Sequence, residues 1–212
     1  MKKQKKHTAM KYTKTSFALS RWCAGLTMGV LLVFGASRAS AQVVVNGNVF
    51  GGGNAADVSG NSTVLMQDHA SVVNDVYGGG ALANVGTSGS NATTVTIEGG
   101  TVDGNVYGGG LGDNSTAALV KGVVTVNIGK DNGGTITGDA TIGGSVFGCN
   151  NVNGTPQDNV FVNIYKTART SGVNTVADAG YALGQVFGGG NKAAYLPVAN
   201  KQTTVHIYTC DT

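Results

Sequence analysis

The chain has 212 residues and a formal charge of +3, but eight of its 14 Lys and Arg residues precede residue 42. Residues 42–212 therefore hold six Lys and Arg against all 11 Asp and Glu, a net charge of −5. An acidic chain with no basic stretch interleaved with aromatic residues lacks the positive surface that phosphate groups require, so we expect no nucleic-acid partner. Abundant Gly, Val and Ile with only two Pro are typical of a folded β-protein rather than a disordered linker.

Residues 1–41 have the layout of a secretory signal peptide. Basic residues extend through Arg21, an apolar run follows from Ala24 to Ala36, and the small residues Ala39-Ser40-Ala41 precede Gln42. The apolar run is shorter than the roughly 20 residues of a bilayer-spanning helix. We therefore expect a cleaved N-terminal signal helix and only a transient membrane contact. The remaining domain, residues 42–212, is expected outside the cell or on its outer surface, with the periplasm as the alternative.

A glycine block recurs along this domain. Its copies are NVFGGG (48–53), DVYGGG (75–80), NVYGGG (105–110), SVFGCN (145–150) and QVFGGG (185–190). The valines of successive blocks are 27, 30, 40 and 40 residues apart. Periods of this size indicate stacked units or an array.

A second segment, with alternating apolar and polar residues, follows each block. Its copies are STVLM (62–66), TTVTI (93–97), VTVNI (124–128), VFVNI (160–164) and TTVHI (203–207). A strand has a period of two, which places the apolar pairs on one face; these are Val64/Met66, Val95/Ile97, Val126/Ile128, Val162/Ile164 and Val205/Ile207. The opposite face carries Leu65, Thr96, Asn127, Asn163 and His206. Each segment is therefore predicted to be a half-buried strand.

Three all-β architectures compete for this pattern. A propeller blade needs about four strands in roughly 40 residues, which the first two repeats are too short to hold. A sandwich does not require similar strands at similar places. A solenoid does require them, because equivalent residues of successive coils stack in columns and length differences become loops. We therefore predict a parallel β-helix-like solenoid of about five coils.

In a solenoid, two columns of the glycine block point in opposite directions. The valine column is expected to be the structural core of the repeat: Val49, Val76, Val106, Val146 and Val186. By alternation the aromatic column points the other way: Phe50, Tyr77, Tyr107, Phe147 and Phe187. Exposed rings would form a binding or assembly stripe, and replacing Tyr77 and Tyr107 would then leave the fold intact. The alternative is that the rings pack under a loop.

The units TVTIEGG and GNVYGGG, within residues 94–110, carry a resemblance to a known group. They resemble the glycine-rich VFGGG/VYGGG repeat proteins that Gram-negative bacteria export, and are similar in kind to the β-helical passenger domains of autotransporter adhesins. The resemblance covers most of residues 42–210. It implies surface or extracellular placement and an adhesin-like or scaffold role. The partner would be an unknown surface ligand, either a glycan or a protein of a host or neighbouring cell, or another copy of the chain.

Catalytic signals are sparse. The domain holds two His and one Arg, and acid–base chemistry on a glycosidic bond requires two groups that flank the bond. We therefore expect no enzyme activity and no cofactor, and a carbohydrate-active β-helix enzyme is the alternative. Two carboxylates and a basic residue meeting in one groove would favour that alternative.

No metal site is predicted either. The stretch GGLGDN (109–114) matches the calcium-binding nonapeptide repeat only in part and occurs once. Cys149 and Cys210 are the only cysteines after residue 41. An oxidising compartment would allow them to pair, but the sequence leaves the pairing open.

Overall fold

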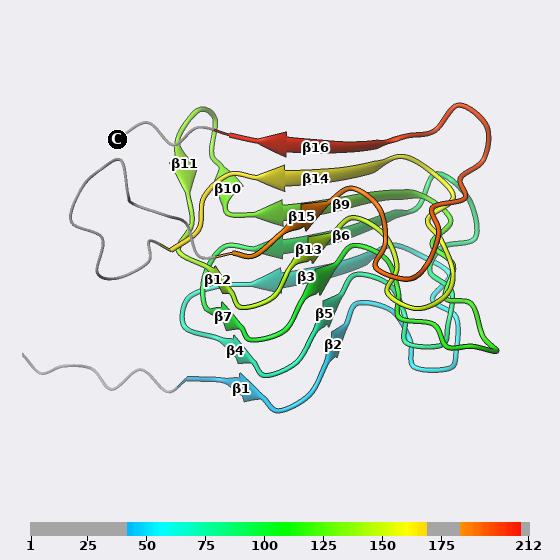
Figure 1. The fold of residues 1–212 in the computed structure, drawn as a ribbon, viewed down its shortest axis with the longest axis horizontal. Coiled ribbons are helices and arrows are strands. Elements are labelled where there is room, and N and C mark those ends of the chain that lie inside the picture. The colour runs from blue at the N-terminus through cyan, green and yellow to red at the C-terminus, as the bar shows by residue number, and fades with distance from the viewer. Residues whose placement is uncertain (1–41, 169–182, 209–212) are drawn as a thin grey trace, which may run out of the picture. The chain divides into compact units, whose positions relative to one another are not determined.

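The computed structural model describes residues 42–168 and 183–208, which belong to the compact unit Ser40–Thr212. Strands, turns and loops account for the whole of this described part, with no helix in it (Figure 1). The predicted all-β class is therefore confirmed. The predicted signal peptide, residues 1–41, lies outside the described residues.

Three parallel sheets build the unit. The four-stranded sheet contains β1 (Val44–Val45), β4 (Ser71–Val72), β7 (Thr101–Val102) and β12 (Thr141–Ile142). The glycine-block sheet contains β2 (Val49–Phe50), β5 (Val76–Tyr77), β8 (Val106–Tyr107), β13 (Val146–Phe147) and β15 (Val186–Phe187). The long-strand sheet contains β3 (Ser62–Met66), β6 (Ala92–Ile97), β9 (Val123–Ile128), β14 (Val160–Ile164) and β16 (Thr203–Ile207).

In each sheet, a strand pairs with the equivalent strand of the repeat before it and the repeat after it. Val76 lies opposite Val49 on one side and Val106 on the other. Val95 likewise lies between Val64 and Val126. Isolated parallel bridges add a fourth line, Val58–Val85–Val120–Pro156. Equivalent residues therefore stack in columns, an arrangement compatible with a β-helix-like fold (Figure 1).

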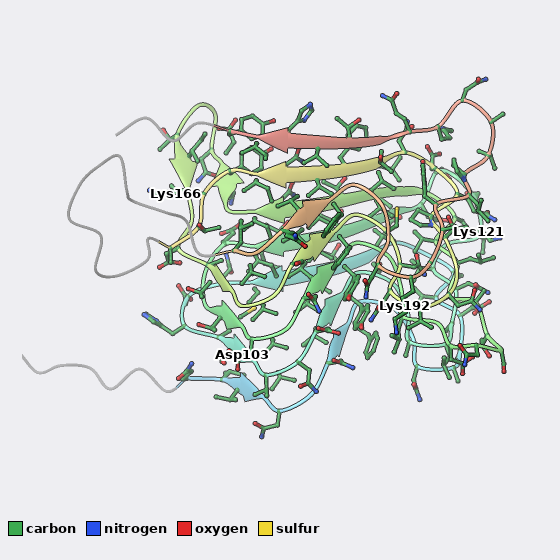
Figure 2. The ribbon with its side chains drawn as sticks, viewed as in Figure 1. Asp103, Lys121, Lys166 and Lys192 are labelled. Atoms are coloured by element: carbon green, nitrogen blue, oxygen red, sulfur yellow. The ribbon has the colours of Figure 1, made fainter. Side chains whose placement is uncertain are left out.

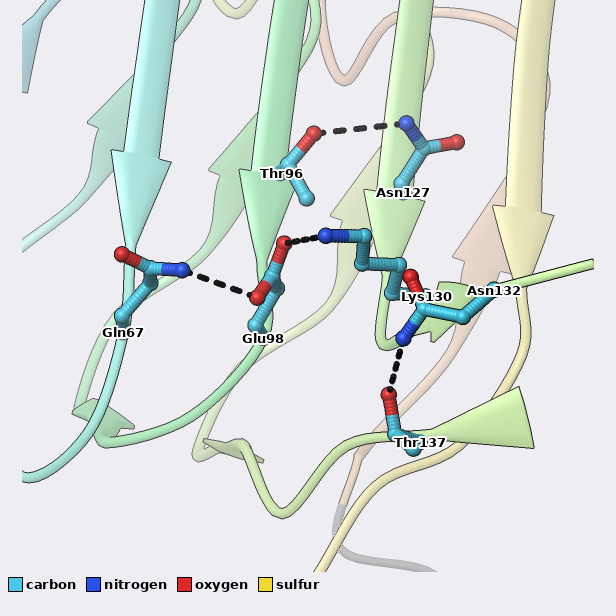
Figure 3. Close-up of polar contacts among 7 residues, drawn as sticks. All are labelled: Gln67, Thr96, Glu98, Asn127, Lys130, Asn132 and Thr137. Atoms are coloured by element: carbon cyan, nitrogen blue, oxygen red, sulfur yellow. Dashed lines mark hydrogen bonds and ion pairs between the residues drawn. The ribbon is translucent and has the colours of Figure 1, made fainter. Parts of the chain in front are cut away.

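One antiparallel hairpin interrupts this pattern. It pairs β10 (Lys130–Asp131) with β11 (Ile136–Thr137) and follows directly on β9. Gly133 and Gly134 both have positive φ in its turn, a conformation that glycine adopts without the steric penalty of a side chain. The hairpin projects Lys130 beside the end of the long-strand sheet (Figure 3).

The core lies between the sheets. Val76, Val106 and Val146 of the valine column are fully buried, whereas Val49 and Val186 at the ends of the column are half-buried and pack against the same core. In β6 and β9, buried and half-buried residues alternate along the strand, as the predicted period of two requires. The core thus receives one apolar side chain from every second position of the long strands.

Close stacking explains why the blocks are rich in glycine. A Cβ atom on Gly78 would collide with the carbonyl oxygen of Gly108, and one on Gly108 would collide with that of Gly148. The backbones of successive repeats approach each other at this corner, so a larger residue would force them apart. Glycine is required here for space.

The aromatic column does not form an exposed stripe. Tyr77 and Tyr107 are each 1% exposed and Phe147 is 7% exposed, while Phe50 is half-buried and only Phe187, at 40%, is open to solvent. Successive rings stack nearly parallel with centroids 4.8 to 4.9 Å apart. The prediction of a surface binding stripe is therefore wrong for the three central rings, and the alternative of rings packed under a loop describes them.

The physical reason lies in the chain that follows each glycine block. Alternation does turn the rings away from the valine core, but the next residues fold back over them. Leu111 packs against the ring cluster, and Asn151 Nδ2 donates a hydrogen bond of 2.8 Å to the Tyr77 hydroxyl. Burial raises the pKa of Tyr107 to about 12, so its hydroxyl stays protonated at neutral pH. The rings form a second small core.

Candidate functional site

The outer face of the long-strand sheet carries a ladder of polar side chains, one from each of four strands. Asn127 Nδ2 donates to Thr96 Oγ1 at 3.3 Å, and Asn163 Nδ2 donates to Asn127 Oδ1 at 2.9 Å. His206 Nδ1 lies 3.3 Å from Asn163 Oδ1. Figure 3 shows the hydrogen bond between Asn127 and Thr96. We call Thr96, Asn127, Asn163 and His206 the amide ladder.

Parallel, in-register pairing explains the ladder. Neighbouring strands lie about 4.8 Å apart, so side chains at equivalent positions of successive repeats can bond directly, as in stacked Asn and Gln ladders. Asn127 is paired in register with Thr96 and with Asn163. The sequence assigned all four ladder residues to the polar strand face, which agrees with their burial: Thr96, Asn127 and Asn163 are half-buried and His206 is exposed. Each amide keeps hydrogen-bonding capacity for a ligand because it has two donors and two acceptor lone pairs.

An open groove of about 280 Å³ runs along this face, lined in part by Leu65, Thr96, Asn127 and Tyr165. At its edge, Lys130 Nζ lies 3.4 Å from Glu98 Oε1, and Gln67 Nε2 donates to Glu98 Oε2 at 2.9 Å (Figure 3). The groove is smaller than the roughly 300–1,000 Å³ of enclosed small-molecule pockets.

One aromatic residue of the groove lining, Tyr165, belongs to a small aromatic cluster. Tyr165 and Tyr208 stack with centroids 4.5 Å apart, and His206 meets Tyr208 edge-on at 6.1 Å. Burial, and then a hydrogen bond with Tyr208, raise the pKa of Tyr165. The Tyr165 hydroxyl therefore stays protonated near neutral pH. A tyrosine hydroxyl can both donate and accept a hydrogen bond. The face combines amide, hydroxyl and ring surfaces.

A neighbouring groove of about 370 Å³ gathers several titratable residues. Asp68, His69, Glu98 and Asp139 all line it. The condition set for the enzyme alternative, two carboxylates and a basic residue in one groove, is therefore met here. No set of three or more His, Cys, Asp or Glu within the described residues is arranged to hold a metal ion.

Other charged residues are dispersed. Figure 2 shows Asp103, Lys166 and Lys192 at separate places around the unit. Asp113, in the stretch that partly matches a calcium repeat, accepts the backbone N–H groups of Ser115 and Thr116 at 2.8 and 2.6 Å. These hydrogen bonds lower the pKa of Asp113. Its carboxylate thus stabilises its own turn.

The cysteines remain a separate question. Cys149 has no disulfide partner among the described residues and is fully buried, and burial raises the pKa of its thiol to about 12. A thiol of this kind has little nucleophilic thiolate at neutral pH. Cys210 lies outside the described residues, so the predicted choice between pairing and no pairing stays open.

The residues that sequence reasoning missed stand at one repeated position. Gln67, Glu98, Tyr165 and Tyr208 each directly follow the last residue of a long strand. Aligning the repeats by their strand ends would have placed these four side chains in one column. Lys130 could not have been found this way, because the hairpin β10–β11 belongs to a single repeat.

No protein-family model, no curated protein and no solved structure matches the chain. The resemblance to exported glycine-rich repeat proteins therefore stays a prediction. Among the residues that the structure describes, no helix is long and apolar enough to cross a membrane.

Proposed function

We propose that this chain is a non-catalytic, secreted or cell-surface repeat protein with an adhesin-like or scaffold role. Its domain is a parallel β-helix-like solenoid of about five coils, and it binds through the outer face of the long-strand sheet. What supports the proposal is the amide ladder, in which two Asn amides, flanked by the Thr96 hydroxyl and the His206 ring, link polar side chains across four strands. Repetition supports multivalent contact, because each added contact is made at high effective concentration.

The chemistry of the face favours a hydroxyl-rich ligand such as a glycan. Amides and hydroxyls can donate and accept, and the rings of Tyr165 and Tyr208 offer apolar surface beside them. The Glu98–Lys130 ion pair adds no net charge to the groove, and Asp131 in its lining contributes one negative charge. A protein surface of a host or neighbouring cell is the other class of ligand for this face.

The test is a binding measurement on variants of the ladder. Replacing Asn127 and Asn163 together by Leu keeps the side-chain volume and removes the amides from the face. The matched control is Asn151→Leu, which also removes an amide that links two repeats but lies over the ring stack. At about 0.5–1.5 kcal/mol per hydrogen bond, two or more lost ligand bonds should weaken binding to a glycan array or to cells roughly tenfold or more. Equal binding by the double variant and the control would contradict the proposal.

Export is part of the same proposal. Residues 1–41 would direct secretion, and cleavage after Ala41 would leave Gln42 as the first residue. N-terminal sequencing of the protein recovered from the periplasm or medium of an expressing bacterium tests this. A mature protein that begins elsewhere would contradict it.

The carbohydrate-active enzyme is kept as a second candidate on one observation, the groove that gathers Asp68, His69, Glu98 and Asp139. Glu98 is already engaged by Lys130 and Gln67 in this groove, which disfavours a role as a free acid or base. Incubation with acidic and neutral polysaccharides separates the two candidates. We expect no cleavage, whereas cleavage that is lost in Asp139→Asn would favour the enzyme.

A further inference from the structure

The outer strands of the stacked sheets have one edge each that pairs with no other described strand. Within the described residues, β16 pairs only with β14 and β15 only with β13. At the other end, β3 pairs only with β6 and β2 only with β5. An unpaired edge presents a row of free N–H and C=O groups that another strand can pair with.

Apolar residues of the core columns are exposed at the C-terminal end, whereas at the N-terminal end Val64 is half-buried and Met66 is buried. Val205 is 38% and Ile207 is 72% exposed, whereas Val95 and Ile97 at the same column positions are fully buried. Phe187 is 40% exposed at the end of a ring stack whose central members are 1% exposed. The difference arises because each end residue has a neighbouring repeat on one side only.

The two ends carry similar strand sequences. The C-terminal end offers Val-Phe in β15 and TTVHI in β16, and the N-terminal end offers Val-Phe in β2 and STVLM in β3. We propose that a second copy of this chain docks head-to-tail, with β16 of one copy pairing with β3 of the next and β15 pairing with β2. Extending the register of the internal pairs sets Val205 opposite Val64 and Phe187 opposite Phe50.

The polar contacts between repeats continue across such a junction. Asn48 Oδ1 accepts the Asp75 N–H at 3.0 Å, Asp75 Oδ1 accepts the Asn105 N–H at 2.7 Å, and Asn105 Oδ1 accepts the Ser145 N–H at 2.9 Å. Gln185 holds the same position at the C-terminal end. Its amide oxygen would accept the Asn48 N–H of the next copy, and neither residue brings a charge into the junction.

A head-to-tail contact uses two different surfaces, so it does not close after two copies and produces linear chains of molecules. The inference is independent of the ligand proposed above, because it depends on the strand edges and not on the outer face. Each added copy would extend the ring stack by another set of repeats, whereas the amide ladder would be interrupted at the junction, where Leu65 lies opposite His206.

Sedimentation of the full chain over a concentration series tests the assembly. We expect species larger than the monomer that grow with concentration. Ile207→Lys should weaken association by roughly tenfold or more, because it places a charge in the docked junction. Val73→Lys is the matched control: Val73 is 40% exposed but lies just after β4, within the stack, and should leave assembly unchanged. A monomer at every concentration, or equal effects of the two substitutions, overturns the proposal.

Cross-linking tests the direction and register. The proposed pairing sets Thr204 opposite Thr63, and paired strands about 4.8 Å apart lie within the Cα separation of about 4.4–6.8 Å that a disulfide allows. Thr63→Cys and Thr204→Cys chains, both with Cys23 and Cys210 replaced by Ser, are mixed and oxidised. A disulfide dimer in the mixture and in neither chain alone supports head-to-tail docking. A dimer from one variant alone, or no dimer in the mixture, overturns it.

Discussion

Removing one ring from the middle of the aromatic stack should destabilise the protein strongly. Tyr107 is 1% exposed and stacks against Tyr77 at 4.8 Å and Phe147 at 4.9 Å. A buried aromatic side chain covers roughly 150–250 Å², worth about 4–6 kcal/mol at 25 cal/mol per Å². Large-to-small aromatic substitutions in cores cost about 3–5 kcal/mol, and we expect Tyr107→Ala to fall in this range. The sequence-based expectation that loss of Tyr77 and Tyr107 leaves the fold intact is reversed, because these rings are buried.

Phe187→Ala is the matched control at the end of the same stack. Its ring is 40% exposed and has one stacking neighbour, Phe147, at 4.9 Å. Phe187 has about half of the buried area and half of the stacking contacts of Tyr107. We therefore expect Phe187→Ala to lower the free energy of unfolding by roughly 1.5–2.5 kcal/mol. Urea unfolding followed by circular dichroism gives the free energy of unfolding of each variant. Equal losses of unfolding free energy in Tyr107→Ala and Phe187→Ala would refute the inference that the loops bury the central rings.

Three further predictions concern the core, a loop and acid stability. Val106→Asp places a charge at a fully buried position and should cost several kcal/mol, seen as loss of cooperative thermal unfolding; a melting temperature near that of the unchanged protein would contradict this. Asn84→Asp should lower the melting temperature, and less so in about 1 M salt, because Asn84 Nδ2 donates to Asp57 Oδ2 at 3.1 Å and a carboxylate there would repel Asp57; an unchanged melting temperature would contradict this. The hydrogen bond from Lys201 holds the pKa of Asp158 below its usual range, so the stabilising effect of this ion pair is present above about pH 4 and is lost as the pH falls through the lowered pKa of the folded state. Asp158→Asn should therefore make stability depend less on pH in the acid range, and an unchanged dependence would contradict the prediction.

The sequence by itself determined the stacked, parallel arrangement of the repeats. Alternation in segments such as TTVTI assigns Val95 and Ile97 to the core and Thr96 to the outer face, because successive side chains of a strand point to opposite sides. Recurrence of the glycine block assigns Val106 to the valine column and requires repeats that stack closely. Strand alternation has a period of two residues, and the glycine block recurs once per repeat. Both patterns are local, so a single sequence is enough to recognise them.

Only the tertiary structure decided which surfaces stay open. Alternation places Tyr107 away from the valine core, but whether a ring is exposed depends on chain that folds back from elsewhere, as Leu111 and Asn151 do. The meeting of Glu98 with Lys130 likewise depends on a hairpin that occurs in one repeat. Ile207 occupies a core position by its sequence pattern yet is 72% exposed, because no described strand pairs with the outer edge of β16. Burial is set by contacts between distant segments, and a periodic sequence specifies only which residues are equivalent.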